Sequence, residues 1–276
     1  MAIQDKHKVS IFSILLKKEK NKLLHLGTGF LIGLNGLFFT CGHTFRKIES
    51  ELKINKFKNL YVGFPSSEAV IYEISSLKYL SYPIYEQFGP VYFDTCIGAI
   101  NHVNSDFVIF NRKRPKNGEV LHAIGLVNTT DTRLHPFENG IADLSGISFI
   151  ETSLIVSHQY PIISDLPKDY QIPRAEVNPR KFFNNCVELN KNLIKGASGC
   201  PIFDQIGLVS GVFVAGSEIN NTSAMILGKY CTKTIKYRTN YNYNMYQDLA
   251  PRRNFTISLQ SSPKQLPASK LASKPH

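Results

Sequence analysis

The sequence lacks the features of an exported or membrane-embedded chain. Its first twenty residues contain an apolar run of only about eight residues, which charged residues follow at once without a small-residue cleavage site. A longer uncharged stretch over 23–42 is interrupted by five glycines, an asparagine and a histidine. It fits paired strands with turns better than a membrane span, which needs continuous apolar sequence. We therefore expect no membrane contact and a cytoplasmic location.

The cysteines lack a metal-binding pattern. None of the five lies in a Cys-x-x-Cys pair, and they are spread along the chain as Cys41, Cys96, Cys186, Cys200 and Cys231. In a chain without a secretion signal, isolated cysteines are usually reduced and pack as small apolar groups. We expect no zinc site, no other metal and no cofactor.

Acidic residues are scarce relative to basic ones. The chain has 32 Lys and Arg against 21 Asp and Glu, a net charge of +11. This balance permits binding to nucleic acid, an anionic membrane or an acidic protein, and it selects none of them. Much of the excess lies in polar segments, such as 17–22 and 111–116, that read as solvated surface. Binding to nucleic acid is therefore not expected, but a basic nucleic-acid-binding β protein stays as an alternative, whose affinity would fall steeply with salt.

Short strand-like segments dominate the first 235 residues. They alternate or run apolar between turns rich in Gly, Pro and Asn, a pattern typical of all-β sandwiches and barrels. Asn35-Gly36, between two apolar runs, is a strong hairpin signal because both residues tolerate positive φ. The expected strands are 8–17, two within 27–43, 59–64, 69–74, 94–100, 106–110, 119–126, 148–156, 200–204 and 207–216.

A polar connector, 111–118, divides the strand-rich part into two segments, each long enough for a six-stranded barrel. We expect an N-terminal barrel over 1–110 and a C-terminal barrel over 111–235. A C-terminal extension over 236–276 follows, first as a helix or irregular segment packed outside. From about residue 251 it is rich in Ser, Pro and Lys and should be disordered.

The stretch "LIKGASGCPIFD" places Ser198 in a glycine-rich turn. A serine hydroxyl becomes a nucleophile only beside a base that a third group orients. His43 follows two small residues at the end of an apolar strand, and Asp94 opens another, where a carboxylate needs a partner for its charge. Asp106 is an alternative acid. Three other histidines read as structural or surface residues: His25, His102 and His122.

Taken together, these segments resemble the chymotrypsin-like (trypsin-like) serine peptidases, in the order His, Asp, Ser. "GTGFLI", "LFFTCGH", "DTCIGAI", "GASGCPIFD" and "GLVSGVFVAG" resemble that family's segments in sequence order, and "GEVLHAIGL" resembles the opening strand of its second barrel. The resemblance implies two six-stranded antiparallel Greek-key barrels. It also implies that Ser198 is the nucleophile, His43 the general base and then acid, and Asp94 the residue that orients the imidazole. The N–H groups of Gly196 and Ser198 would form the oxyanion hole.

The same resemblance implies a substrate pocket lined by Val214, Ala215 and Gly216, with Asn192 near its floor. No aspartate stands at the floor position to select Arg or Lys, so we expect a neutral pocket for medium-sized apolar or polar side chains. Glu218 lies just past Gly216, where it could attract a basic group at the rim.

Two residues depart from the family pattern. Ala197 stands where digestive members carry an aspartate that pairs with the N-terminal amine after zymogen cleavage. We therefore expect activity without N-terminal trimming, and a loop that is ordered by packing or by a partner. Cys200 replaces the second glycine after the serine, and we expect it to be buried and inert.

The sequence thus predicts an intracellular serine endopeptidase that acts on a protein or peptide substrate through an acyl-enzyme. A free peptidase would be hazardous in the cytosol, so we expect that substrate choice or a regulatory protein partner restricts it. The alternative from another class is a catalytically silent, trypsin-like protein-binding module.

Overall fold

The structure is a computed structural model. It describes residues 3–19, 21–45, 59–81, 92–102, 106–130, 134–158, 186–217, 221–228 and 231. The chain divides into one unit over Met1–Thr239 and a second over Asn240–His276. The expected C-terminal extension, with its helix or irregular segment and its disordered tail, lies outside the described residues.

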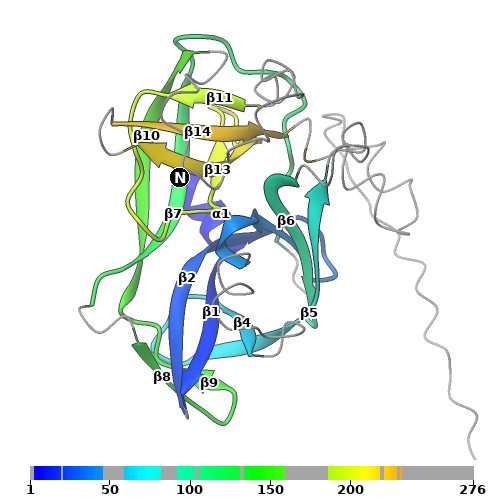
Figure 1. The fold of residues 1–276 in the computed structure, drawn as a ribbon, viewed down its shortest axis with the longest axis vertical. Coiled ribbons are helices and arrows are strands. Elements are labelled where there is room, and N and C mark those ends of the chain that lie inside the picture. The colour runs from blue at the N-terminus through cyan, green and yellow to red at the C-terminus, as the bar shows by residue number, and fades with distance from the viewer. Residues whose placement is uncertain are drawn as a thin grey trace, which may run out of the picture. The chain divides into compact units, whose positions relative to one another are not determined.

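Six antiparallel strands of the N-terminal part form a closed ring in the order β1-β4-β5-β6-β3-β2, in which β2 pairs back onto β1 (Figure 1). Their bounds are β1 Ile11–Glu19, β2 Lys22–Leu31, β3 Leu37–Cys41, β4 Leu60–Gly63, β5 Ala69–Ser81 and β6 Tyr92–Ile100. Phenylalanine and branched aliphatic side chains fill this barrel, with Phe12, Phe38 and Phe45 at most 1% exposed.

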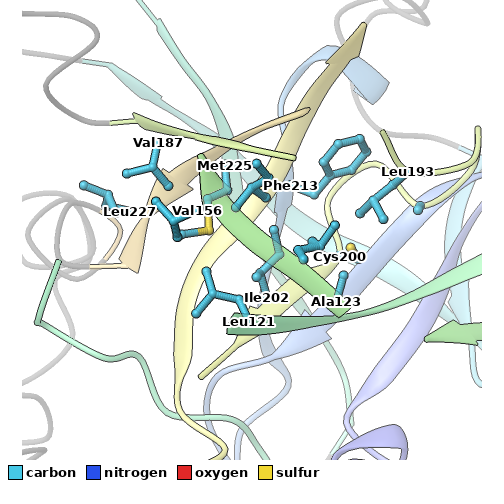
Figure 2. Packing of buried hydrophobic residues seen from close by; sticks show 13 residues of the cluster. Leu121, Ala123, Val156, Val187, Leu193, Cys200, Ile202, Phe213, Met225 and Leu227 are labelled. Atoms are coloured by element: carbon cyan, nitrogen blue, oxygen red, sulfur yellow. The ribbon is translucent and has the colours of Figure 1, made fainter. Parts of the chain in front are cut away.

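A second closed barrel has the order β10-β11-β14-β13-β12-β7. Its strands are β7 Val120–Asn128, β10 Ile147–His158, β11 Cys186–Leu189, β12 Pro201–Phe203, β13 Val209–Ser217 and β14 Thr222–Leu227. Figure 2 shows side chains from all six strands meeting in its core, together with Leu193 and Cys200 from the loop before β12. The predicted all-β double barrel is confirmed.

The hairpin predicted around Asn35-Gly36 joins β2 to β3, but its turn differs from the expected one. Gly36 has φ +73°, whereas Asn35 is not among the residues with positive φ. The Ile32 N–H donates to the Leu37 carbonyl at 2.8 Å, which closes a loop longer than two residues. Only the glycine therefore uses the left-handed region.

A short hairpin lies after the expected division at residue 111 in the sequence but pairs with the first barrel. Its strands, β8 Leu134–Glu138 and β9 Ile141–Ala142, pair with β2 and β5 of the first barrel.

The segment 106–110, expected as a strand, forms only one parallel bridge, Phe110 to Val209. It instead runs between the barrels, since Val108 N–H donates to the Leu31 carbonyl at 3.0 Å. The sequence interpretation also missed β11, β14 and the short helix α1.

Helix α1, Ile3–Lys8, packs on the second barrel. The His7 ring stacks on Phe203 of β12 with centroids 4.7 Å apart. The Lys8 Nζ atom lies 2.6 Å from a carboxylate oxygen of Glu151 on β10. No helix in the described part of the chain is long and apolar enough to span a membrane.

Candidate active site

The loop 193–200, which carries Ser198 and is called the serine loop below, is bonded to Thr28 in the middle of β2. The Thr28 N–H donates to the Ser198 carbonyl at 2.9 Å. Its hydroxyl donates to the Gly196 carbonyl at 3.1 Å and accepts from the Leu126 N–H of β7 at 2.9 Å. Its carbonyl accepts from the Thr40 hydroxyl of β3 at 2.7 Å. One buried threonine thus fixes the serine loop against three strands.

Replacing Thr28 by valine is expected to lower the free energy of unfolding by about 1–3 kcal/mol, because a buried N–H and a buried carbonyl lose their partner while the volume stays the same. Urea unfolding of the two proteins measures this difference. The control is Thr28→Ser, which keeps the hydroxyl and should lose less stability than the valine variant. A valine variant as stable as the wild type would show that the hydroxyl does not fix the loop.

Hydrogen bonds hold the serine loop in a defined shape. The Ala197 N–H donates to the Ile194 carbonyl at 3.1 Å, and the Cys200 N–H donates to the Ala197 carbonyl at 2.9 Å. The Gly199 N–H donates to the Phe213 carbonyl of β13 at 2.9 Å. Two hydrogen bonds within the loop and one to β13 therefore fix its backbone.

Two N–H groups of the loop take no part in these hydrogen bonds. Among the hydrogen bonds of the described residues, none uses the N–H of Gly196 or the N–H of Ser198. Gly196 has φ +107°, a conformation that glycine alone adopts without strain. N–H groups that no protein acceptor occupies are one requirement of an oxyanion hole.

His43 follows β3 in a turn that the Phe45 N–H closes by donating to the Gly42 carbonyl at 3.1 Å. The Nε2 atom of His43 lies 3.7 Å from the Cys41 sulfur. No hydrogen bond of the described residues involves the Ser198 hydroxyl. Hydrogen bonds between catalytic groups are often long without substrate and shorten when it binds.

The His43 turn and the serine loop meet at Gly27 of β2. A Cβ atom placed on Gly27 would lie 3.0 Å from the Ser198 carbonyl oxygen and 3.3 Å from the hydroxyl oxygen of Thr44, the residue after His43. The turn that holds His43 and the loop that holds Ser198, which lie far apart in the sequence, are therefore both next to Gly27.

Asp94 lies in β6, and its side chain is outside the described residues. Its neighbour Thr95 pairs with Cys41. Because strand pairs continue in register, the next position places Asp94 beside the residues that lead into His43. The alternative, Asp106, precedes Val108, which bonds to Leu31 near the other end of β3. The register favours Asp94.

The predicted substrate-binding residues lie on β13 and on the segment before the serine loop. A Cβ atom on Gly216 would collide with the Asn192 amide, so these two residues are in direct contact. The Asn192 Oδ1 atom is buried without a hydrogen-bond partner. Val214 is 3% exposed, whereas the Ala215 side chain is outside the described residues.

Cys200 points into the core of the second barrel (Figure 2) and is fully buried. Burial, with a smaller contribution from Cys41, raises the pKa of its thiol. A thiol in apolar surroundings stays protonated and is a poor nucleophile. Ala197 is also fully buried, and a Cβ atom on Gly125 would lie 2.9 Å from its methyl carbon. No charged group stands at position 197 to order the loop.

No group of three or more His, Cys, Asp or Glu side chains that could hold a metal occurs among the residues that the structure describes.

Among the comparisons with known proteins, similarities come from solved structures and not from sequences. No family model matches the sequence, and no curated protein sequence matches it. The structure is similar to the active form of the Rv3671c protease from M. tuberculosis, with a TM-score of 0.54 and 17% identity over 84% of this chain and 82% of that chain. It is similar to Deg5, with a TM-score of 0.52 and 16% identity over 87% and 93%.

The serine endoprotease from Yersinia pestis has a TM-score of 0.50 and 15% identity over 84% of this chain and 63% of that chain, so this chain spans less than two thirds of its length. Together with the two closed six-stranded barrels, these similarities show that the chain has the chymotrypsin-like double-barrel fold of the trypsin-like serine proteases.

Proposed function

We propose that this protein is a serine endopeptidase with Ser198 as nucleophile, His43 as general base and acid, and Asp94 as the residue that orients the imidazole. One observation carries the proposal. The N–H groups of Gly196 and Ser198 are unbonded, whereas those of Ala197, Gly199 and Cys200 are bonded, and this loop lies against the turn that holds His43.

Hydrolysis would proceed in two steps. The Ser198 oxygen attacks the scissile carbonyl carbon while its proton passes to His43, and the two N–H groups stabilise the negative oxygen. His43 then gives that proton to the leaving amine, which leaves an ester on Ser198. A water molecule then attacks the ester while His43 takes its proton, and His43 passes that proton to the Ser198 oxygen as the bond to the acyl carbon breaks and the acid leaves. Each oxyanion donor of this kind contributes about 10²–10³ in rate.

The proposed substrate is an extended segment of a protein or peptide. Such a segment would pair through its main chain with residues 214–216 and place one side chain against Asn192. The partnerless Asn192 Oδ1 atom is a buried acceptor. It is covered by the protein and lies against Gly216, so it is not an acceptor for the substrate; Asn192 is uncharged, which fits a neutral pocket for medium-sized apolar or polar side chains.

A cytoplasmic location and a regulatory protein partner remain part of the proposal. All five cysteines are free thiols and all are buried, which is the state expected in a reducing compartment.

Labelling with a fluorophosphonate probe, combined with cleavage of a mixed peptide library, tests the proposed function. We expect stoichiometric labelling and defined cleavage sites. A protein that binds library peptides but is neither labelled nor active would be a silent binding module. A protein that is inert toward both, and that binds nucleic acid with an affinity falling steeply with salt, would support the nucleic-acid-binding alternative.

A further inference from the structure

Cys41 is the last residue of β3, and its thiol lies beside the imidazole of His43. The sulfur atom is 3.7 Å from Nε2 of the ring, a distance at which a thiol forms a weak hydrogen bond. The same sulfur lies 2.9 Å from the Thr44 hydroxyl oxygen. Cys41 is fully buried, and Thr44 is nearly so. The nitrogen that would take the proton of Ser198 is therefore already in contact with a buried thiol.

The surrounding backbone fixes the position of Cys41. The residue pairs with Thr95 of β6 at the end of β3. Its N atom lies 2.8 Å from the position that a Cβ atom on Gly199 would occupy, so the serine loop packs directly against it. Cys41 therefore lies where the turn that holds His43 meets the loop that holds Ser198.

The donors and acceptors of this cluster follow from the proposed function. A general base carries its lone pair on the nitrogen that faces the nucleophile, so Nε2 of His43 is an acceptor. The Cys41 thiol is then the donor to Nε2, because the ring nitrogen has no proton to give. The Thr44 hydroxyl donates in turn to the sulfur, which is a weak acceptor. One chain of hydrogen bonds thus runs from Thr44 through Cys41 to His43.

The Ser198 hydroxyl takes no part in this chain. No hydrogen bond of the described residues involves that hydroxyl, whereas Nε2 of His43 has the Cys41 sulfur as a partner. A neutral imidazole has a single acceptor nitrogen. The thiol and the serine hydroxyl therefore compete for the same lone pair.

We propose that Cys41 is a positioning residue whose thiol, fixed by Thr44, holds Nε2 of His43 in the free enzyme, so that the imidazole engages Ser198 only when a substrate is bound. The inference rests on the proposed peptidase function and deepens it. It identifies a contact that lowers the reactivity of the serine while no substrate is present. Because a thiol is a weak donor, the hydrogen bonds that tighten on substrate binding displace it at small cost.

The test compares Cys41→Ala, which removes the donor, with Cys41→Ser, which keeps one. When only a fraction of the free molecules is competent, the apparent affinity for substrate is reduced by that fraction, and removing the competing contact restores it. We expect Cys41→Ala to raise kcat/KM and the rate of fluorophosphonate acylation by about 2–10-fold. The gain should come from a lower KM, with kcat within about twofold of the wild type. Cys41→Ser should stay close to the wild type.

The matched control is Cys96→Ala, which removes another fully buried thiol of the first barrel. The Cys96 side chain belongs to the apolar core of that barrel, and its residue pairs with Thr40, the neighbour of Cys41. This variant should lose stability through its cavity and keep the wild-type kcat/KM. If Cys41→Ala does not fold, Thr44→Val, which releases the thiol, should give the same increase in kcat/KM to a smaller extent.

Infrared spectroscopy of the S–H stretch tests the contact without any catalysis, because donating a hydrogen bond weakens the S–H bond and lowers its frequency. The Cys41 band is the one that disappears in Cys41→Ala, and Cys96→Ala identifies the Cys96 band in the same way. We expect the Cys41 band to move to higher frequency in His43→Ala, while the Cys96 band stays in place.

A kcat/KM that is unchanged or lower in Cys41→Ala would overturn the inference. So would equal increases in Cys41→Ala and Cys41→Ser, or in Cys41→Ala and Cys96→Ala, because the donor would then not be the cause. A Cys41 band that does not respond to His43→Ala would also overturn it. An inert wild type in which this band does respond would reject the peptidase function while keeping Cys41 as the residue that holds the imidazole.

Discussion

Alanine at position 198 is expected to abolish peptide hydrolysis. Removing the nucleophile of a serine peptidase typically lowers kcat by about 10⁶, because no other group can form the acyl-enzyme. The fold should be retained, since the Ser198 hydroxyl makes no hydrogen bond among the described residues. Thr28 holds the loop through the Ser198 backbone carbonyl, which alanine keeps. Initial rates on a cleaved library peptide, with Tm measured in parallel, check both expectations.

The matched control is Cys200→Ser, two residues further along the chain. The Cys200 side chain lies in the apolar core of the second barrel, so this change should cost stability and leave turnover per folded molecule within a few-fold of the wild type. If Ser198→Ala retained activity and Cys200→Ser lost it, the nucleophile would be the cysteine, and the role proposed for Ser198 would be wrong.

Alanine at Gly199 is expected to have the second largest effect, on folding as well as on activity. Gly199 has φ +87°, and a Cβ atom there would collide with the Thr40 hydroxyl and the Thr28 carbonyl oxygen and would lie 2.8 Å from the Cys41 N atom. Two of these three atoms belong to the backbone and cannot rotate away. The left-handed conformation and the overpacking together should cost about 2–5 kcal/mol.

Gly118→Ala separates the two causes. Gly118 has φ +79°, but no atom lies within 4 Å of the position of its Cβ. The free energy of unfolding of this variant should fall only by the cost of the left-handed conformation, about 1–2 kcal/mol. Urea unfolding of both variants measures the difference. Equal losses of unfolding free energy in the two variants would mean that the serine loop does not pack against β2 and β3 as described.

The sequence predicted the barrels because each strand is short, apolar and bounded by turn residues. It also predicted which turns carry His43 and Ser198, since small residues precede the histidine and glycines flank the serine. The strand β14 was missed because "TSAMIL" is short and follows another strand closely. The segment 106–110 was wrongly expected as a full strand, since its apolar pattern serves contacts with both barrels.

The contacts of Thr28 and of His25, whose ring lies 2.7 Å from the Ser13 hydroxyl and beside Gly196, could not be predicted from the local sequence. Thr28 bonds to Gly196 across 168 positions of sequence, and nothing around a threonine in a strand identifies such a partner. His25 was interpreted as a structural or surface residue because no small residues or matching acid adjoin it. Its environment comes from strand pairing and from the serine loop, which only the folded chain brings together.

The most direct test of the central claim is the site of covalent attachment of a fluorophosphonate, located by fragmentation mass spectrometry of the peptide beginning at Gly196. We predict one adduct per molecule, on the Ser198 oxygen, and none after the protein is unfolded before labelling. An adduct at another residue, or a folded wild-type protein that remains unmodified, would contradict the account.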